Sequence, residues 1–555
     1  MNGSNSKTGS NSQAWRKKPR QFAPKSKLGC KTCKIRRIKC DQARPSCLKC
    51  QSTGRTCDGY DVASHLVGLE VKTSQYHHPE AVPALNCGSS NSYAASNVRQ
   101  VPYTHHQSHH SLIFQNPRAL LLLPVDSAQA EAMSFFEVTS VKHLNEYYPS
   151  ESWRETLMLF SQTIPSVRHA AVALSLIHRS FHDGCSTQSE YRALFHYNKA
   201  IQLFLALNSG DDVEAMVTTL LVCYLFTSFD NLSGNYRRAM IHLQGGVKLS
   251  RSIPSLMLDG TSVSSVNVFL MEVVKQLRRL DMQAGAYLVG WSPVDIQVTF
   301  GEEPLFLNEA FESVDHATNC HQVLLARAMG IHWMAQEASF VDGVPSVYSK
   351  QLVIEELESW SRRFQDMLST NNHYSTDIES NRLITLLKLQ NIVLWILVSS
   401  LGPDREMEYD KFLPVFQRCV AMVDEVAIGH QHHEGSSKPR FTQDVAILPI
   451  LYIIGAKCRD PMVRRDVLRI LRRQPLREAV WDSAFAARAV ERIFEIEEEK
   501  VGGGSIKTME EIDVSQRVEC VSWEQVINNQ YGARLELEYT LCKQERRHIE
   551  SLTVF

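Results

Sequence analysis

Residues 30–57 read CKTCKIRRIKCDQARPSCLKCQSTGRTC, and six cysteines in this stretch follow the spacing C-x2-C-x6-C-x6-C-x2-C-x6-C. They are Cys30, Cys33, Cys40, Cys47, Cys50 and Cys57. The stretch divides into two near-identical halves, each of which opens with a C-x2-C pair. Two cysteines three positions apart at the start of a helical turn can place both sulfurs on one metal ion, at about 2.3 Å for zinc. The spacing therefore predicts a small metal-cluster domain.

The number of ligands indicates a cluster of two zinc ions. Two tetrahedral zincs need eight sulfur contacts, and six thiolates supply eight if two of them bridge both metals. The internal symmetry nominates the first cysteine of each half, Cys30 and Cys47, as the bridging ligands. The thiolates bring more negative charge than the metals neutralise, and basic residues stand between the ligands to compensate: Lys31, Lys34, Arg36, Arg37, Lys39, Arg44 and Lys49.

Two other interpretations explain the cysteines less well. A disulfide framework requires an oxidising compartment, but residues 1–13 are polar and contain no apolar core of a secretory signal. A single four-cysteine zinc site leaves two regularly spaced cysteines without a role.

Beyond its cysteines, the stretch contains the run KIRRIKC at residues 34–40 and Pro45 two residues before the fourth cysteine. With these features it resembles the fungal zinc binuclear cluster DNA-binding domain. The resemblance implies two short helices packed around the metals, with the end of the first helix in the major groove over a CGG-like triplet. By position it places Arg36 and Arg37 nearest the bases.

The chemistry of these side chains agrees with that placement. An arginine fork matches the O6 and N7 acceptors of guanine, while Lys31, Lys34 and Lys39 suit phosphate oxygens. A solvated face or charge balance for the cluster is the alternative for each basic residue, and for Lys34 and Lys49 both interpretations stay open.

The charge of the chain is distributed unevenly along its 555 residues. Residues 16–56 hold fourteen lysines and arginines and one acidic residue, a net charge of +13, whereas the rest holds 45 basic and 59 acidic residues, a net charge of −14. A basic module on an acidic body is typical of a nucleic-acid binder with a separate regulatory or partner-binding domain.

The remaining cysteines and the apolar segments predict a soluble intracellular protein. Eight further cysteines are scattered singly, as expected of core residues or thiols in a reducing compartment. We expect no contact with a membrane, because no run reaches the roughly 18 apolar residues that span a bilayer. The longest apolar candidate, residues 391–401, is too short.

The chain before residue 126 is predicted to contain only one folded domain, at residues 28–60. Residues 1–27 form a disordered basic tail, in which Arg16, Lys17, Lys18 and Arg20 suggest nuclear import, additional phosphate contacts, or both. Residues 61–125 form a low-complexity linker whose histidine pairs we interpret as solvated rather than metal-binding. The linker lacks three consecutive heptads of a coiled coil, so the module binds DNA as a monomer or is paired through the large domain.

From residue 126 onward the sequence predicts a large all-α domain with a possible β-hairpin at its C-terminus. Apolar residues recur at three- and four-residue intervals in 133–147, 167–181, 190–207 and 213–229, and turn-forming stretches such as Asp183-Gly184 separate these segments. Asp211 and Asp212 are candidate N-caps, and Asp460-Pro461 is a helix start. Residues 533–541 alternate apolar and charged side chains, which predicts a strand. Residues 495–499 are interpreted as a charged helix face rather than an activating segment.

Several short sequence motifs in residues 126–555 resemble those of the regulatory domain that accompanies these zinc clusters in filamentous fungi. They are His196–Ile201, Gly234-Asn235 with His242-Leu243, Arg279–Gln283, Lys457–Pro461 with Arg464-Arg465, and Trp481–Ser483. The resemblance implies a helical domain that regulates or dimerises a transcription factor. We interpret the motifs themselves as helix packing and capping rather than as catalytic residues.

Together these features predict a nuclear, sequence-specific, DNA-binding regulator of RNA polymerase II transcription with two structural Zn²⁺ ions. The expected partners are double-stranded DNA, a second copy through the helical domain, and the transcription machinery or coregulators. An enzyme targeted by its zinc cluster is the first alternative, but the sequence lacks G-x-x-x-x-G-K-[ST], H-E-x-x-H, G-x-S-x-G and G-x-G-x-x-G. A protein-interaction module stapled by zinc is the second, and the basic segment argues against it.

Overall fold

The computed structural model divides into two compact units, Met1–Ala63 and Ser64–Phe555, each of which is described by itself. The structure describes residues 31–57 except 37, 39, 42–46 and 56; residue 122; and residues 126–554 except 185–186, 207–212, 252, 254–264, 288–290, 292–309, 339–346, 371–377, 403, 433–437, 500–505, 529–531 and 545. In the first unit, the described residues form the short helices α1 (Lys31–Ile35) and α2 (Leu48–Gln51). The prediction of two short helices beside the cysteines is confirmed.

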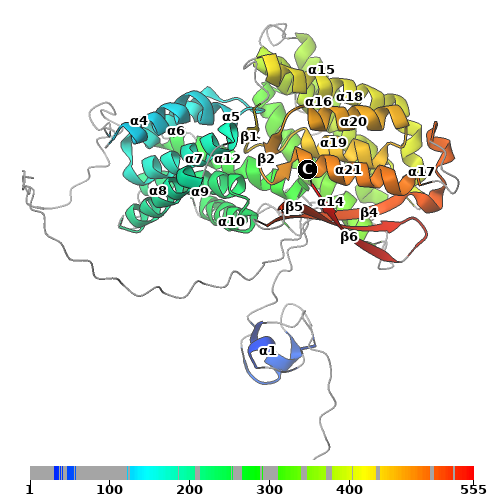
Figure 1. The fold of residues 1–555 in the computed structure, drawn as a ribbon, viewed down its shortest axis with the longest axis horizontal. Coiled ribbons are helices and arrows are strands. Elements are labelled where there is room, and N and C mark those ends of the chain that lie inside the picture. Colours follow the sequence, from blue (N-terminus) through cyan, green and yellow to red (C-terminus); the bar gives the residue numbers. More distant parts are fainter. Residues whose placement is uncertain are drawn as a thin grey trace, which may run out of the picture. The chain divides into compact units, whose positions relative to one another are not determined.

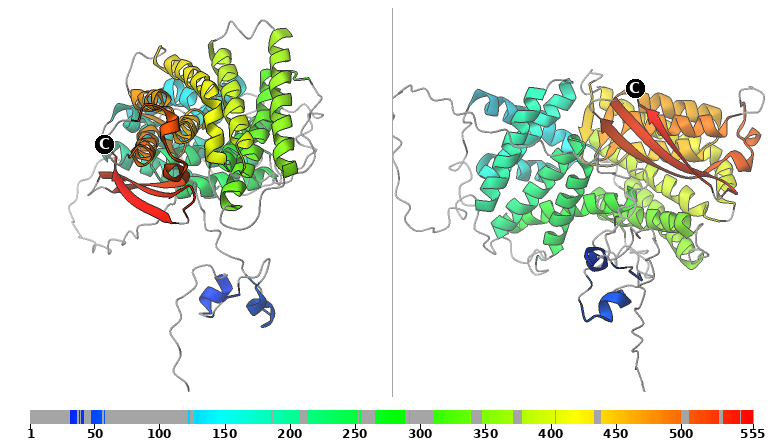
Figure 2. Two further views of the ribbon diagram at one scale, coloured as in Figure 1. Left: turned by 90° about the vertical axis from the view of Figure 1, so that its right-hand side faces the viewer. Right: turned by 60° about the horizontal axis from the view of Figure 1, so that its bottom comes forward.

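The second unit is mostly helical, as the sequence predicts (Figure 1). Its first half contains α4 (Ser127–Phe135), a π-helical turn η2 (Phe136–Ser140), α5 (Val141–Leu144), α6 (Glu151–Thr163), α7 (Pro165–Asp183), α8 (Thr187–Ala206), α9 (Val213–Leu232), α10 (Tyr236–Arg251) and α12 (Ser265–Tyr287). Its second half contains α14 (Val314–Ala338), α15 (Val347–Thr370), α16 (Ile378–Ser399), α17 (Arg405–Glu408), η4 (Tyr409–Phe412), α18 (Leu413–His432), α19 (Leu448–Lys457), α20 (Pro461–Arg473) and α21 (Ser483–Glu497), followed by the 3-10 turns Met509–Glu511 and Val514–Gln516. Helix α12 packs on α9 in the first half and on α14 in the second, and so joins them (Figure 2).

The helix boundaries follow the local signals in the sequence. Helices α7, α8 and α9 cover three of the predicted segments, and α7 ends at Gly184, whose φ of 65° is the left-handed conformation that glycine adopts without strain. The fourth segment, 133–147, is divided among α4, η2 and α5. Asp460 caps α20 by accepting hydrogen bonds from the backbone N–H groups of Met462 and Val463, which confirms that helix start. The predicted caps Asp211 and Asp212 lie outside the described residues.

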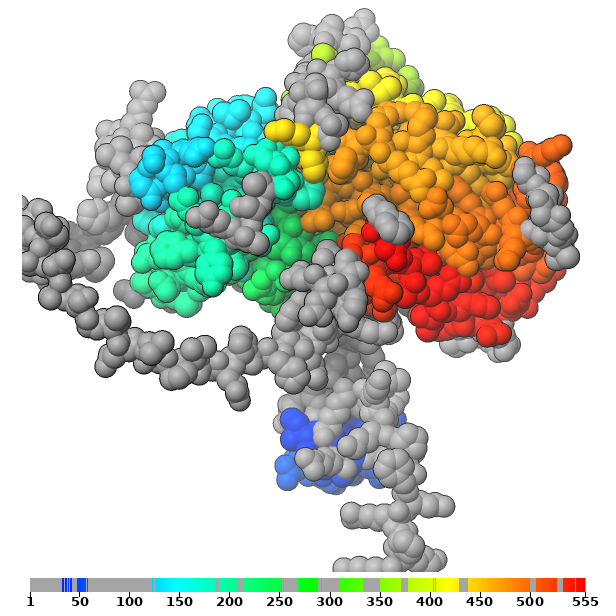
Figure 3. Space-filling model, viewed as in Figure 1, coloured from blue at the N-terminus to red at the C-terminus, as the bar shows by residue number. Residues whose placement is uncertain are grey.

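A three-stranded antiparallel sheet closes the C-terminal end of the domain, where the sequence predicts only a hairpin. It consists of β4 (Val518–Asn528), β5 (Gly532–Leu541) and β6 (Arg547–Thr553) in that order. The predicted strand is β5, whose alternation buries Leu535 and Leu537. The sheet lies against α21, and in Figure 3 its strands, in red, adjoin an orange part of the surface.

A second, small sheet ties the two halves together. Strand β1 (Arg440–Thr442) pairs in parallel with β2 (Leu476–Glu478), and β2 pairs antiparallel with β3 (Trp481–Asp482). The buried carboxylate of Glu478 accepts hydrogen bonds from the backbone N–H groups of Ala446, Ile447 and Leu448 at the start of α19, at 2.9–3.0 Å. Burial raises the pKa of Glu478 to about 7, although these N–H groups oppose the shift.

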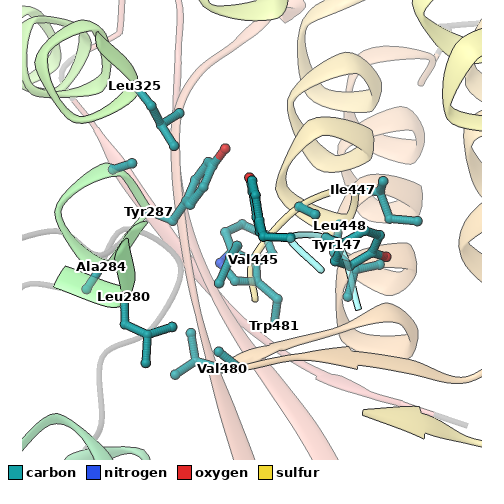
Figure 4. Close-up of a cluster of buried hydrophobic side chains, with 14 of the residues drawn as sticks. Tyr147, Leu280, Ala284, Tyr287, Leu325, Val445, Ile447, Leu448, Val480 and Trp481 are labelled. Atoms are coloured by element: carbon teal, nitrogen blue, oxygen red, sulfur yellow. The ribbon is translucent and has the colours of Figure 1, made fainter. Parts of the chain in front are cut away.

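Beside this sheet, buried side chains from α12, α14 and α19 meet in one cluster. Figure 4 shows Tyr287, Leu325, Ile447 and Leu448 converging there together with Tyr147, which lies beyond the end of α5. The two halves therefore share a hydrophobic core.

Two helices of this core, α9 and α16, are long and apolar. By length and composition alone, α9 and α16 could cross a membrane, so the expectation that no segment reaches this size is wrong. Their apolar windows are 72% and 61% buried inside the domain, and α9 carries the buried polar residues Asp230 and Asn231. Both are therefore core helices of the domain.

The short sequence motifs quoted above for the helical domain form buried polar contacts and helix caps. This agrees with their interpretation as packing and capping residues. The Tyr197 hydroxyl donates to Asp230 at 3.1 Å, and the Arg279 guanidinium lies 3.0 Å from the Asp444 carboxylate. Asp482 caps α21 through the backbone N–H of Ala484. The interpretation of residues 495–499 is correct only in part, because Glu495 is exposed whereas Glu497 is fully buried.

Candidate metal centre

The described cysteines of residues 31–57 converge on one small volume. Cys33 lies in α1 and Cys50 in α2, so the second cysteine of each C-x2-C pair is carried by a short helix. The side chains of Cys33, Cys47 and Cys50 are fully buried, Cys40 is 5% exposed and Cys57 is partly exposed. In a domain this small, cysteine sulfurs take the place of an apolar core.

The sulfur atoms form two overlapping groups of three. In Cys33, Cys40 and Cys47 the Sγ atoms all lie within 4.8 Å of one another, and the same holds for Cys47, Cys50 and Cys57. The Sγ atom of Cys33 is 3.6 Å from that of Cys47 and 3.9 Å from that of Cys50. An S–S bond is about 2.05 Å long, so these contacts are not disulfides. Four sulfurs around a tetrahedral zinc at about 2.3 Å stand roughly 3.8 Å apart, which fits the observed distances.

The overlap of the two sulfur groups indicates which cysteine could bridge the two metals. Cys47 belongs to both groups, as a residue that contacts two metals would. Each group lacks one ligand of a tetrahedral site among the described cysteines. Cys30, the other nominated bridge, lies outside the described residues, so its assignment stays a prediction.

Backbone and side-chain hydrogen bonds hold the second half of the cluster in place. Cys47 caps α2 through its sulfur, which accepts from the backbone N–H of Cys50 at 3.3 Å. The carboxylate of Asp41 accepts from the backbone N–H groups of Leu48 and Lys49 at 2.9 and 3.0 Å. A carboxylate at this position stabilises the helix, because the N-terminus of a helix carries a partial positive charge. Asp41 is the only acidic residue of the basic stretch 16–56, and such an isolated acidic residue is a sequence signal for a structural role.

Few of the predicted DNA-binding residues can be placed. A guanidinium nitrogen of Arg36 donates to the Thr53 hydroxyl at 3.1 Å, which links the end of α1 to the turn after α2. Lys31 and Lys34 lie on α1. Arg37, Lys39 and the basic tail Arg16, Lys17, Lys18 and Arg20 lie outside the described residues, so their roles stay predictions.

Comparison with known proteins places two domains on the chain. The fungal Zn(2)-Cys(6) binuclear cluster domain matches residues 28–65, and the fungal specific transcription factor domain matches residues 133–285. The cysteines are thus placed for metal binding in a domain that binds two zinc ions. Every protein ligand of this set is sulfur, which suits a structural zinc site rather than one that activates water.

Relatives match over different parts of the chain. The aspercryptin biosynthesis cluster-specific transcription regulator of Emericella nidulans is 23% identical, over 87% of this chain and 89% of its own length. The transcription regulator lscL of Purpureocillium lilacinum is 25% identical over 39% of this chain and 46% of its own. A transcriptional regulatory protein of Schizosaccharomyces pombe, moc3, is 50% identical over 42 residues, 8% of each chain. No solved structure matches.

Proposed function

We propose that this chain, which belongs by its two domains to the fungal Zn(2)-Cys(6) DNA-binding transcription regulators, reads CGG-like triplets in the major groove and regulates RNA polymerase II transcription in the nucleus. The convergence of the described cysteines in two groups that share Cys47 supports the proposal most directly. Two zinc ions held in this way keep α1 and the basic residues that follow it in one rigid arrangement, which can be presented to the DNA bases.

The charge distribution supports the same function. The cluster and its flanking tail carry a net charge of +13, against −14 for the rest of the chain. Lysines and arginines near phosphates release counterions and supply the affinity that is independent of sequence, while one or two arginines at base edges supply the discrimination. We place Arg37 at a guanine edge, with Arg36 beside it.

Substitution of Arg37 by alanine tests this division of roles. Arg37→Ala is expected to weaken binding to a CGG-containing duplex by about 1–3 kcal/mol, because a bidentate contact with guanine is lost. Binding to scrambled DNA should change little. Fluorescence anisotropy at fixed salt, with both duplexes, measures the difference.

Arg55→Ala is the matched control. Arg55 is an exposed arginine between two cysteines of the second half, and its loss should weaken binding to both duplexes equally. The same equal loss for Arg37→Ala would reassign that residue to the phosphate backbone.

We further propose that the helical domain pairs two copies of the chain and presents them to coregulators. The linker lacks a run of heptads that could pair the modules, and the helical domain accounts for most of the chain. Selection of random duplex DNA with residues 1–125 should return one triplet, whereas selection with the full chain should return two triplets at a fixed spacing. A single triplet from the full chain would show that it binds DNA as a monomer, and the absence of any enriched motif at low salt would contradict the DNA-reading role itself.

A further inference from the structure

Helix α8 has apolar side chains on two opposite faces. Its inner face packs chiefly on α7 and buries Ala193, Tyr197 and Ala200. Its outer face carries four large apolar side chains that stay exposed: Tyr191 (82%), Leu194 (44%), Phe195 (64%) and Leu205 (75%). A helix that is apolar on all sides is normally enclosed by other parts of the structure. On α8 the outer face has no covering element among the described residues.

This outer face is the largest exposed apolar feature of any helix in the described part of the domain. The other described helices expose at most two large apolar side chains each. An aromatic side chain has about 150–250 Å² of surface, so the four residues on α8 together expose on the order of 500 Å². Exposed patches of about 300–600 Å² are often functional. In Figure 1, α8 lies at the outer edge of the first half of the domain.

The outer face has the spacing of a coiled-coil seam. Tyr191, Asn198 and Leu205 are seven residues apart from one to the next, and Leu194 and Ile201 follow the first two by three residues. These are the a and d positions of consecutive heptads. Ile201 is partly buried against the core, so it forms the inner border of the seam. The partner that matches such a seam is another helix with the same spacing.

Asn198 favours a second copy of the chain as the source of that helix. It is exposed and lies in the middle of the apolar seam. Against a wholly apolar helix, its amide would lose water without gaining a hydrogen bond, which is unfavourable. Between two α8 helices in register, the Asn198 amides of the two copies meet and can bond to each other. A single asparagine at an a position is known to fix register and the number of strands in this way.

We propose that α8 is the surface through which two copies of the chain pair, with their α8 helices side by side and in register at Asn198. The inference rests on the proposed pairing of the helical domain and names the face that performs it. A stable interface buries about 800 Å² per partner. The apolar seam supplies more than half of this area, and exposed polar neighbours such as Arg192 and Gln202 form the rim. Two-fold symmetry brings the same patch of both copies together.

Sedimentation of the full-length, zinc-loaded chain without DNA, at micromolar concentration, tests the proposal. The wild type should sediment with twice the mass of one chain. Phe195→Glu places a charge beside the seam and should raise the dissociation constant of the dimer by about 30-fold or more, as loss of an interface hot spot does. Ile241→Glu is the matched control, because Ile241 is a similarly exposed apolar residue (59%) on α10. This variant should remain a dimer.

An isosteric change at the middle of the seam tests the register. Asn198→Asp brings two carboxylates together at neutral pH and should raise the dissociation constant by about 10-fold or more, since like charges repel across an interface. Asn319→Asp makes the same change at an exposed asparagine of α14 and should have no effect. Both positions are exposed in the single chain, so the far-ultraviolet circular dichroism should not change.

The possible failures of the inference can be told apart. If the wild type is a dimer and both α8 variants remain dimers of unchanged affinity, pairing occurs elsewhere and α8 is left to a different partner such as a coregulator helix. Equal losses in an α8 variant and its matched control would also overturn the assignment. A wild type that sediments as a single chain would overturn the pairing itself together with this inference. None of these results would affect the proposed reading of DNA by the zinc cluster.

Discussion

Removal of both zinc ions from the full-length chain should abolish specific DNA binding and unfold the cluster domain, while the helical domain keeps its secondary structure. Residues 28–60 are too few to bury an adequate core, and the buried side chains of the described part are the cysteines themselves. For structural zinc sites of this size, metal binding supplies about 10–16 kcal/mol of apparent folding free energy. The helices of the second unit have their own hydrophobic core and do not depend on the metal.

The experiment combines metal analysis, circular dichroism and DNA binding on one preparation treated with a strong zinc chelator. The far-ultraviolet spectrum, dominated by the helical domain, should change little while the affinity for a CGG-containing duplex disappears. Addition of zinc should restore binding, and magnesium should not. If specific binding persists after metal analysis confirms zinc removal, the cluster is not what positions the DNA-reading residues.

Single cysteine variants separate the bridging ligand from a terminal one. Cys47 belongs to both sulfur groups, so Cys47→Ala is expected to remove a ligand from both metals. Cys57 belongs to one group, so Cys57→Ala removes a ligand from one metal. Cys47→Ala should therefore lose more zinc and more DNA affinity than Cys57→Ala. Equal stoichiometry in the two variants would remove Cys47 from the bridging position.

The features that the sequence predicts well are those encoded over short distances along the chain. Metal ligation can be inferred from cysteine spacing because two cysteines three apart on a helical turn have little choice of geometry. The bounds of α7 follow likewise from its apolar period and from Gly184 at its end. Asp460 and Pro461 begin α20 through interactions within a few residues of each other.

Features that depend on partners distant in the sequence escape prediction. Strands β1, β2 and β3 are two or three residues long, too short to show an alternation. Arg279 and Asp444 meet across 165 positions of sequence, and neither position indicates its partner. Gln283 accepts from the backbone N–H of Val445, which lies 162 positions away. The sequence motif that contains Gln283 therefore identifies a conspicuous residue but not its partner.

Glu495 and Glu497 lie two residues apart in one acidic run, but Glu495 is exposed whereas Glu497 is buried. The carboxylate of Glu497 accepts from Arg459 at 3.0 Å and from the backbone N–H of Val518 at 2.7 Å, and it is also bonded to Arg464. The side chains of Glu497 and Arg459 are 0% exposed, and that of Arg464 is 1% exposed. The group joins α21, the start of α20 and the first strand of the C-terminal sheet.

Replacement of Glu497 by glutamine is expected to lower the free energy of unfolding by about 1.5–3 kcal/mol. Arg459 and Arg464 lose their shared counter-charge and keep, among the described residues, only Glu406 and Glu498, respectively, as carboxylate partners. Glu495→Gln is the matched control on the same helix. Glu495 pairs with Arg488 and Arg492 at the surface, where an ion pair contributes about 0–1 kcal/mol. Urea unfolding of the helical domain, followed by circular dichroism, measures both variants.

The pH dependence of the same variant tests the origin of the loss. Burial alone would raise the pKa of Glu497, but Arg459 and Arg464 outweigh it and hold the pKa below the usual value of 4.5. An acid whose pKa is lower in the folded state stabilises the fold above its unfolded pKa and loses this contribution as the pH falls through the folded value. The difference in stability between the wild type and Glu497→Gln should therefore be largest near neutral pH and shrink below about pH 4.5. A difference that stays constant down to pH 3 would mean that packing, rather than the buried charge, accounts for the effect.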